Sequence, residues 1–258
     1  MVLALWSPKG GVGTSVLAAA VALAVARDVA ARDVAAREAR ARDVVAREAR
    51  ARHTVAGVRL ADLTGDLPAV LGLGADPVLG LGDWLAVGPE APGEALDRLV
   101  VEVAAGVGLL PLGTPPDAAP GEAGAALAVV LRDGPCPAVV DCGTASTPAV
   151  RALVETADVS VAVLRPCYLA LRRAVHSPLL DTTLGVAVVE EEGRALGTKE
   201  VSEVLDRPVL ARVPVRGDVA RAVDAGVLTT RLPQALERPA LRLAARAGLL
   251  PTRRGAAA

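Results

Sequence analysis

Aromatic residues are nearly absent from this sequence, which contains no phenylalanine, one tyrosine and two tryptophans. Proteins that bind single-stranded nucleic acids stack the bases on aromatic side chains, so the composition argues against that class. Cysteine is scarce as well. Cys136, Cys142 and Cys167 are odd in number and lack metal-ligand spacing, which predicts reduced thiols rather than a disulfide framework or a zinc site.

Net charge and long uncharged runs are also lacking. The formal net charge is −1, so no strong basic field favours nucleic acid, although a local basic patch would be enough for non-specific contact with DNA. Arg27 ends the apolar run that begins at Ser15, short of the roughly 18 residues of a membrane span, and the N-terminus lacks the basic start of a secretory signal. We therefore expect a cytoplasmic protein.

Hydrophobic residues make up 52% of the 258 residues, which is enough for a sizeable core. We expect a single domain over residues 1–250, with a repetitive helical insertion at about 27–56. The proline-rich and glycine-rich stretch 111–124 is predicted to be a loop, and residues 251–258 a frayed tail.

Apolar runs of strand length recur between helical stretches. They are continuous rather than alternating, which is typical of strands buried on both faces. Strands separated by helices favour right-handed crossovers, so the predicted fold class is α/β, a mostly parallel twisted sheet covered by helices on both faces. The predicted strands are Val2–Leu5, Val58–Leu63, Val107–Leu110, Ala138–Asp141, Val159–Leu164, Val186–Val189 and Val209–Val213.

Six pentads interrupt this pattern. Residues 27–56 read RDVAA RDVAA REARA RDVVA REARA RHTVA. The spacing repeatedly places an acid four residues before an arginine, beginning with Asp28 and Arg32, and each pair stabilises a helix by roughly 0.2–0.5 kcal/mol. Five residues turn about 140° around a helix, so no single apolar face forms and we expect a solvated helix. A repeat tolerated at the surface and a partner-binding arm both remain open.

The length of this segment restricts its path. A helix from Ser15 to His53 would span about 57 Å, roughly twice what a crossover helix needs. The few residues from Thr54 to Gly57 reach at most about 14 Å. A single straight helix packed against the sheet throughout is therefore excluded. We expect a break or a frayed section within residues 33–48, which would make a protruding helical hairpin.

A glycine-rich stretch, WSPKGGVGTSVL, joins the first predicted strand to this helix. Phosphate loops work because backbone N–H groups converge on an anion at a helix N-terminus, where glycine lets the main chain approach. Ser15 stands where the loop hydroxyl would bind magnesium, but Pro8 and Thr14 break the usual pattern GxxxxGK[ST]. Lys9 is one of only two lysines among 28 basic residues, the other being Lys199, and a compact ammonium suits a phosphate site as a point charge.

The residues KGGVGTS resemble the deviant Walker A motif, KGGxGK[ST], of the ParA/MinD superfamily of partitioning and cell-positioning ATPases. In that family the first lysine, matched by Lys9, reaches across a nucleotide-sandwich homodimer to the partner's phosphates. Thr14 replaces the second lysine, at a cost of about 1.5–3 kcal/mol, roughly tenfold to hundredfold in affinity. The resemblance implies a P-loop NTPase-like fold and a site for ATP and Mg²⁺ formed by Lys9, Gly10, Gly11, Val12, Gly13, Thr14 and Ser15.

Two further aspartates continue the resemblance. VRLADLTGDLPAVLGL, residues 58–73, is similar to the family's second strand and switch region. Asp62 matches its first aspartate, whereas Thr64 stands in place of the second, water-orienting carboxylate. Asp66 would substitute only if the loop were rearranged. Asp62 and Asp66 are therefore the catalytic candidates, and the resemblance implies weak or absent hydrolysis.

Two later segments complete the implied site. PAVVDCGT, residues 137–144, resembles a Walker B strand, in which Asp141 would hold Mg²⁺ through water beside Ser15. An ordinary strand that ends in a capped turn is the alternative interpretation. VPVRGDVARAVDAG, residues 213–226, resembles the late loop around the base. Pro214 is assigned a contact with the base there, although Arg216 replaces a more usual acid.

The arrangement of WSPKGG, LADL-x-GDLPAVLG and RPCYLALRRA is most similar to an actinobacterial branch of CpaE-like and septum-site-determining proteins. It implies a nucleotide-dependent homodimer at a polar or septal location, with protein partners from the division, pilus or partition machinery. A nucleotide-free pseudo-ATPase scaffold and an active partitioning ATPase stay open as alternatives.

Other functional interpretations are weaker. A dinucleotide site would need a third glycine where Val16 stands. Neither His53 nor His176 has a cysteine or serine partner that would indicate a triad. Residues 241–250, LRLAARAGLL, resemble a peripheral membrane tail, but core packing is favoured over membrane contact.

Overall fold

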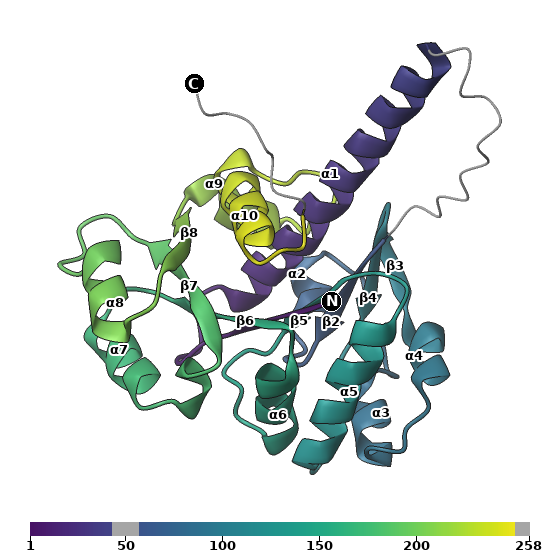
Figure 1. Cartoon of the computed structure of the whole chain (residues 1–258), viewed down its shortest axis with the longest axis horizontal. Helices are drawn as coiled ribbons and strands as arrows, with labels where there is room; N and C mark the ends of the chain where they lie inside the picture. The colour runs from purple at the N-terminus through teal and green to yellow at the C-terminus, as the bar shows by residue number, and fades with distance from the viewer. Residues whose placement is uncertain (43–56, 251–258) are drawn as a thin grey trace.

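The computed structural model describes residues 1–42 and 57–250. Its centre is an eight-stranded sheet with the order β3-β4-β2-β5-β1-β6-β7-β8 (Figure 1). Of these strands, β3 alone runs antiparallel to its neighbour, so the sheet is mostly parallel, as predicted. The strands are β1 Val2–Trp6, β2 Val58–Asp62, β3 Val101–Ala104, β4 Val107–Leu110, β5 Ala138–Asp141, β6 Val159–Leu164, β7 Thr183–Glu190 and β8 Val209–Pro214.

The central strand β1 shows why its sequence is apolar at every position. All five residues are buried. Leu3 and Leu5 pack in one apolar cluster, whereas Val2, Ala4 and Trp6 pack in another, because alternate side chains of a strand point to opposite faces. Each face of the sheet therefore has its own apolar layer.

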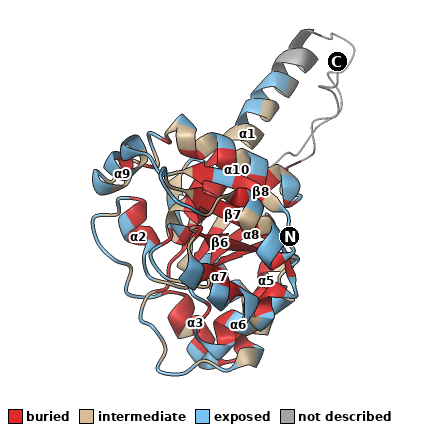
Figure 2. Ribbon diagram, turned by 90° about the vertical axis from the view of Figure 1, so that its left-hand side faces the viewer, coloured by how far each residue is buried: buried red, intermediate tan, exposed pale blue. Residues whose placement is uncertain are grey.

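Helices cover both faces, which confirms the predicted fold class (Figures 1 and 2). One layer contains α1 Thr14–Arg42, α2 Leu67–Val70, α9 Gly217–Asp224 and α10 Gln234–Arg246. The other contains α3 Leu81–Val87, α4 Gly93–Leu99, α5 Gly121–Asp133, α6 Pro148–Thr156, α7 Tyr168–Val175 and α8 Thr198–Leu205. Figure 2 shows the buried sheet between these layers and the exposed outer sides of the helices.

Helix α1 has a buried first half. Residues 17–26 are all buried, because their mostly alanine and valine side chains let the helix pack against both the sheet and α10. The segment Thr14–Ala35 reaches a mean hydropathy of 1.6 and is long and apolar enough to cross a membrane by length and composition alone. This length was not expected, because Arg27 ends the uncharged run in the sequence. Of that apolar window, 61% is buried inside the fold, as in the core helix of a globular domain.

The second half of α1 projects from the domain (Figure 1). Its first predicted ion pair forms, with Arg32 Nε 2.6 Å from Asp28 Oδ2. The helix is continuous through residues 33–42, so the predicted break is not found there. Residues 43–48, where the break was also expected, and the remaining pentads up to residue 56 lie outside the described residues.

Several expectations need correction or fall outside the described range. Strand β3 was not predicted, because it lies at the sheet edge, where Val101 and Glu102 are exposed. The stretch 111–124 is a loop only to residue 120, since α5 begins at Gly121. Core packing was favoured for the run 241–250, and its residues Leu243 and Leu250 are buried in the core. Residues 251–258 are not described.

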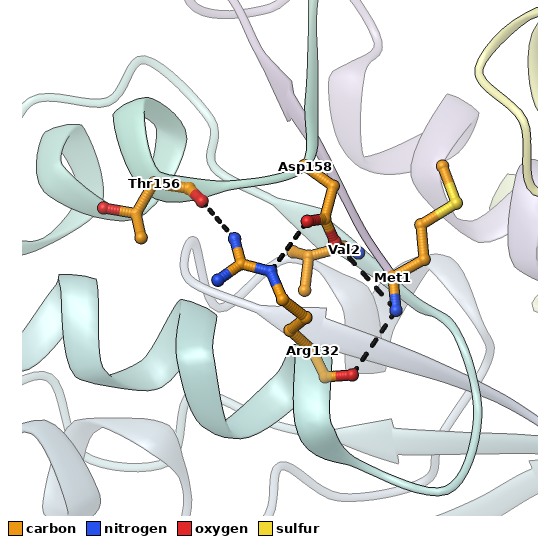
Figure 3. Close-up of polar contacts among 5 residues, drawn as sticks. All are labelled: Met1, Val2, Arg132, Thr156 and Asp158. Carbon is orange, nitrogen blue, oxygen red and sulfur yellow. Dashed lines mark hydrogen bonds and ion pairs between the residues drawn. The ribbon is translucent and has the colours of Figure 1, made fainter.

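The amino edge of the sheet is closed by a polar cluster around Asp158, just before β6 (Figure 3). The Val2 N–H donates to Asp158 Oδ2 at 2.7 Å, and Arg132 Nε lies 2.7 Å from Oδ1. The same guanidinium donates to the Thr156 carbonyl. Burial raises the pKa of Asp158, but the bond from Val2 and the charge of Arg132 outweigh it, so the pKa lies below its usual value.

Candidate functional site

A cavity of about 880 Å³ opens at the carboxyl ends of the central strands. We call it the larger cavity. Its walls are the loops that follow β1, β2 and β5, together with Arg165 after β6 and Asp224 at the end of α9. The chain runs from β1 towards β2 on one side, while β6 lies on the other side of β1. This is the switch point at which open α/β sheets bind ligands.

The loop after β1 is held open by its glycines. Gly11 and Gly13 have φ angles of 72° and 94°, which side-chain-bearing residues rarely adopt. A Cβ at either position would meet nothing within 4 Å, so backbone conformation rather than crowding requires glycine. The Ser7 N–H donates to the Gly143 carbonyl at 2.7 Å, which ties the loop to the turn after β5. The result is an open backbone cradle at the start of α1.

The predicted loop residues divide into two groups. Gly10, Gly11, Gly13, Thr14 and Ser15 line the larger cavity, whereas Lys9 does not. Lys9 is half-buried, and its main chain exchanges hydrogen bonds with the Ser7 hydroxyl. The Thr14 side chain is 7% exposed. The cavity therefore receives no lysine from its own loop.

Asp141 is fully buried behind the wall of the larger cavity, where it contacts Ser15 and Thr64, which line the cavity. Its Oδ1 accepts a hydrogen bond from the Gly143 N–H at 3.1 Å, and its Oδ2 is 3.1 Å from Thr64 Oγ1. Burial raises the pKa of Asp141 to about 6, against the lowering effect of the Ser15 hydroxyl. A buried carboxyl beside a loop hydroxyl is the kind of oxygen donor set that Mg²⁺ prefers.

Asp62 is also fully buried, but its oxygens are already occupied. Oδ1 accepts hydrogen bonds from the Thr64 and Gly65 N–H groups, each at 2.9 Å, and Oδ2 from the Leu67 N–H at 3.2 Å. Burial raises its pKa, and these bonds oppose the rise. Asp62 thus holds the turn that leads into α2. Asp66 is exposed and lines the larger cavity.

A second cavity of about 220 Å³ adjoins the first, and we call it the smaller cavity. Its wall is mostly apolar, and Pro214 at the end of β8 forms part of it together with Val12 and Val219. The predicted base contact at Pro214 thus lies in an apolar niche beside the phosphate loop. A flat aromatic ring system is the kind of group that such a niche fits.

Arg165 and Asp224 were not singled out from the sequence, yet both line the larger and the smaller cavity. Arg165 directly follows β6, and Asp224 is the last residue of α9. A basic residue at the carboxyl end of a buried strand was an available signal for Arg165. Asp224 carried no such signal, because its position depends on how α9 packs.

No protein-family profile matches the sequence, and no curated protein matches it. Solved structures do match, each with a TM-score near 0.68 or 0.67. A ParA family ATPase from Chlorobium tepidum is 19% identical, with 93% of this chain and 95% of that chain covered. The MinD cell division protein of Aquifex aeolicus is also 19% identical, with 95% of each chain covered.

The septum site-determining protein MinD of Pyrococcus horikoshii, solved as a complex with Mg-ADP, is 17% identical over 94% of this chain and 93% of that chain. Its TM-score is 0.67, against 0.68 for the other two structures. These similarities extend over nearly the whole chain. The chain therefore has the P-loop NTPase-like α/β fold of the ParA and MinD ATPases.

Proposed function

We propose that this chain is a positioning or partitioning protein of the ParA/MinD type that binds ATP with Mg²⁺ and hydrolyses it slowly or not at all. The observation that carries the proposal is the larger cavity, whose wall contains the open backbone of Gly11 and Gly13 and the Ser15 hydroxyl, which contacts the buried carboxyl of Asp141. The similarity to a MinD structure solved with Mg-ADP supports it.

Magnesium would be held jointly by protein and nucleotide. Within residues 1–42 and 57–250, no group of three His, Cys, Asp or Glu side chains could hold a metal ion. Ser15 and Asp141 would supply a hydroxyl and a carboxylate, the latter through water, and phosphate oxygens and further water would provide the remaining ligands. The ion would neutralise phosphate charge, while the loop N–H groups orient the phosphates.

Weak turnover follows from the residues that face the cavity floor. Thr64 Oγ1 contacts both Asp62 and Asp141, at 2.9 and 3.1 Å. Thr64 thus bridges two carboxyl groups and does not itself provide a carboxylate that could orient water. Asp62 is fully buried, accepts main-chain N–H bonds and is not among the residues that line the larger cavity, so it is not presented to a water molecule there. Asp66 is the one free carboxylate of the loop after β2 at the cavity wall, which keeps an active partitioning ATPase as the alternative.

Lys9 supports the dimeric part of the proposal. It lies beside the loop but outside the lining of its own cavity. A residue in that place can reach a phosphate of a second copy more readily than one of its own chain. We propose a nucleotide-dependent homodimer with partners from the division, pilus or partition machinery.

Calorimetric titration with ATP, in the presence and absence of Mg²⁺, tests the proposal. We expect Mg²⁺-dependent binding that Ser15→Ala weakens. Ser146→Ala is the matched control, because Ser146 lines the same cavity but is not among the groups that contact Asp141. Absence of binding at millimolar ATP would contradict the proposal and favour a nucleotide-free scaffold.

A turnover assay separates slow hydrolysis from the active alternative. We expect little phosphate release from the wild-type protein. Rapid release that is lost in Asp66→Ala would show instead that the chain is an active ATPase with a relocated carboxylate.

A further inference from the structure

The two cavities meet along a shared wall. Five residues line both, and only two of the five are charged. They are Gly13, Val16, Arg165, Val223 and Asp224. A ligand that extends from the apolar niche to the phosphate loop passes along the wall that contains Arg165 and Asp224. The chemistry of these two side chains therefore determines what can lie at the junction.

Arg165 is the one basic residue among those that line the larger cavity. Its Nε is buried and finds no hydrogen-bond partner among the described residues. The nearby Glu191 is bound to Arg194 instead, with 2.9 Å between Arg194 Nε and Glu191 Oε2. A buried donor without an acceptor costs about 1–3 kcal/mol, which a bound anion would recover. Arg165 thus supplies a basic side chain to the cavity, in which Thr14 stands in place of the second motif lysine.

Asp224 brings the opposite charge to the same junction. It is exposed at the end of α9, and no ion pair involving it is found within the described residues. A carboxylate only accepts hydrogen bonds, so it repels phosphate oxygens and suits hydroxyl donors. In a nucleotide, the ribose hydroxyls lie between the base and the phosphates. Carboxylates recognise ribose in this way in dinucleotide sites.

We infer that Arg165 binds the inner phosphates and Asp224 the ribose hydroxyls of a nucleotide whose base lies in the smaller cavity. The inference rests on the proposed nucleotide binding and names the part of the ligand that this site recognises. Affinity within one chain then comes from the nucleoside diphosphate portion, because no lysine lines the larger cavity. Guanidinium is suited to this role, since its fork binds phosphate oxygens in pairs.

Calorimetric titration of the full chain with Mg-ADP and Mg-ATP tests the role of Arg165. Arg165→Gln should weaken both ligands by the same factor, roughly tenfold to hundredfold, as expected for the loss of a charged hydrogen bond. Arg165→Lys should recover part of the loss because it keeps the charge. Arg212→Gln is the matched control. Arg212 lines neither cavity and lies 3.9 Å from Glu190, so its change should be less than about threefold.

Asp224→Ala tests the ribose contact. The measured quantity is the ratio of the affinities for ADP and 2′,3′-dideoxy-ADP, because the charge lost in the variant affects both affinities equally. The wild-type protein should prefer ADP over 2′,3′-dideoxy-ADP by roughly tenfold, and the variant should lose this preference. An unchanged preference in the variant would overturn the ribose assignment. Thermal unfolding followed by circular dichroism verifies that each variant is folded.

The outcomes distinguish this inference from the proposed function. Binding by the wild-type protein that Arg165→Gln leaves unchanged would overturn the role of Arg165 alone. Loss of ATP affinity without loss of ADP affinity would overturn the assignment to the inner phosphates. A wild-type protein that binds no nucleotide would overturn the proposed function, and the inference with it.

Discussion

The amino and carboxyl ends of the parallel strands differ in how their carboxyl groups are paired. At the amino edge, Asp158 is bound by Val2 and Arg132, and its pKa is lowered (Figure 3). At the carboxyl edge, Asp141 is fully buried with a pKa raised to about 6, and Arg165 has a buried nitrogen that finds no hydrogen-bond partner among the described residues. At the amino edge the carboxylate is paired with an arginine of the same chain. At the carboxyl edge no ion pair to Asp141 or Arg165 is found within residues 1–42 and 57–250.

The largest expected effect is a gain of stability at the carboxyl edge. Because the pKa of Asp141 is raised in the folded state, its carboxyl destabilises the fold increasingly as the pH rises from the usual pKa near 3.8 to about 6. Above about pH 6 the full destabilisation is present. Asp141→Asn should therefore raise the free energy of unfolding at pH 7.5, without Mg²⁺, by up to about 3 kcal/mol. Urea denaturation measures the change.

The pH dependence provides the control for this prediction. The gain should be smaller at pH 5 than at pH 7.5, because the folded-state carboxyl is then mostly protonated. The variant should also lose stabilisation by Mg-ATP. A variant that is less stable than the wild type at pH 7.5 would show that Asp141 is satisfied within the chain.

Restoring a cation should have the next largest effect. Thr14→Lys places an ammonium in the wall of the larger cavity, and we expect Mg-ATP affinity to rise by about 1.5–3 kcal/mol, roughly tenfold to hundredfold. Thr144→Lys is the matched control, because it adds the same charge to the same cavity from the turn after β5 and should give a smaller gain. Equal gains would mean that only net charge matters at this edge.

At the amino edge, neutralising the carboxylate should lower the free energy of unfolding instead of raising it. Asp158→Asn removes the charge that binds Arg132, so we expect a loss of about 1–2 kcal/mol in the free energy of unfolding at pH 7. A lowered folded-state pKa means that this stability is present above the usual value near 3.8 and is lost as the pH falls through the lowered value.

The neighbouring exposed carboxylate tests whether position or charge causes that loss. Asp133 is exposed and lies next to Arg132 at the end of α5. Asp133→Asn should change the free energy of unfolding by less than about 0.5 kcal/mol. Chemical denaturation of both variants at pH 7 compares them. A similar loss in both would assign the effect to net charge.

The smallest effect is expected away from both edges. Arg32→Ala removes the ion pair with Asp28 on the projecting half of α1 and should cost no more than about 0.5 kcal/mol. The change is measured as a shift in the urea midpoint. A loss above 1 kcal/mol would indicate that this half of the helix contributes to the core.

The fold was largely predictable, because burial on both faces leaves a direct record in the sequence. β1 is apolar at every position for this reason. β3 was missed because an exposed edge strand keeps polar residues such as Glu102, and its pairing depends on the hairpin turn at Gly106. The proline-rich loop was placed too far along, because Gly121 begins α5 despite its poor helix propensity.

The site was predictable only where a motif is contiguous. The loop residues and Asp141 follow their strands directly, so strand ends located them. Asp62 was recognised, but its occupied oxygens depend on the turn to Leu67 and are visible only in the structure. Arg165 and Asp224 line the same two cavities because β6 lies beside β1 and α9 ends at these cavities. Long-range pairing of this kind leaves no local pattern.

The continuity of α1 couples the phosphate loop to a distant point in the solvent. The helix starts at Thr14 beside the larger cavity and runs to Arg42 without a break. At 1.5 Å per residue its projecting half is about 24 Å long, so a tilt of about 5° in the buried half would shift the far end by roughly 2 Å. Any tilt of the buried half that accompanies a change at the loop would therefore be enlarged at the far end of the helix.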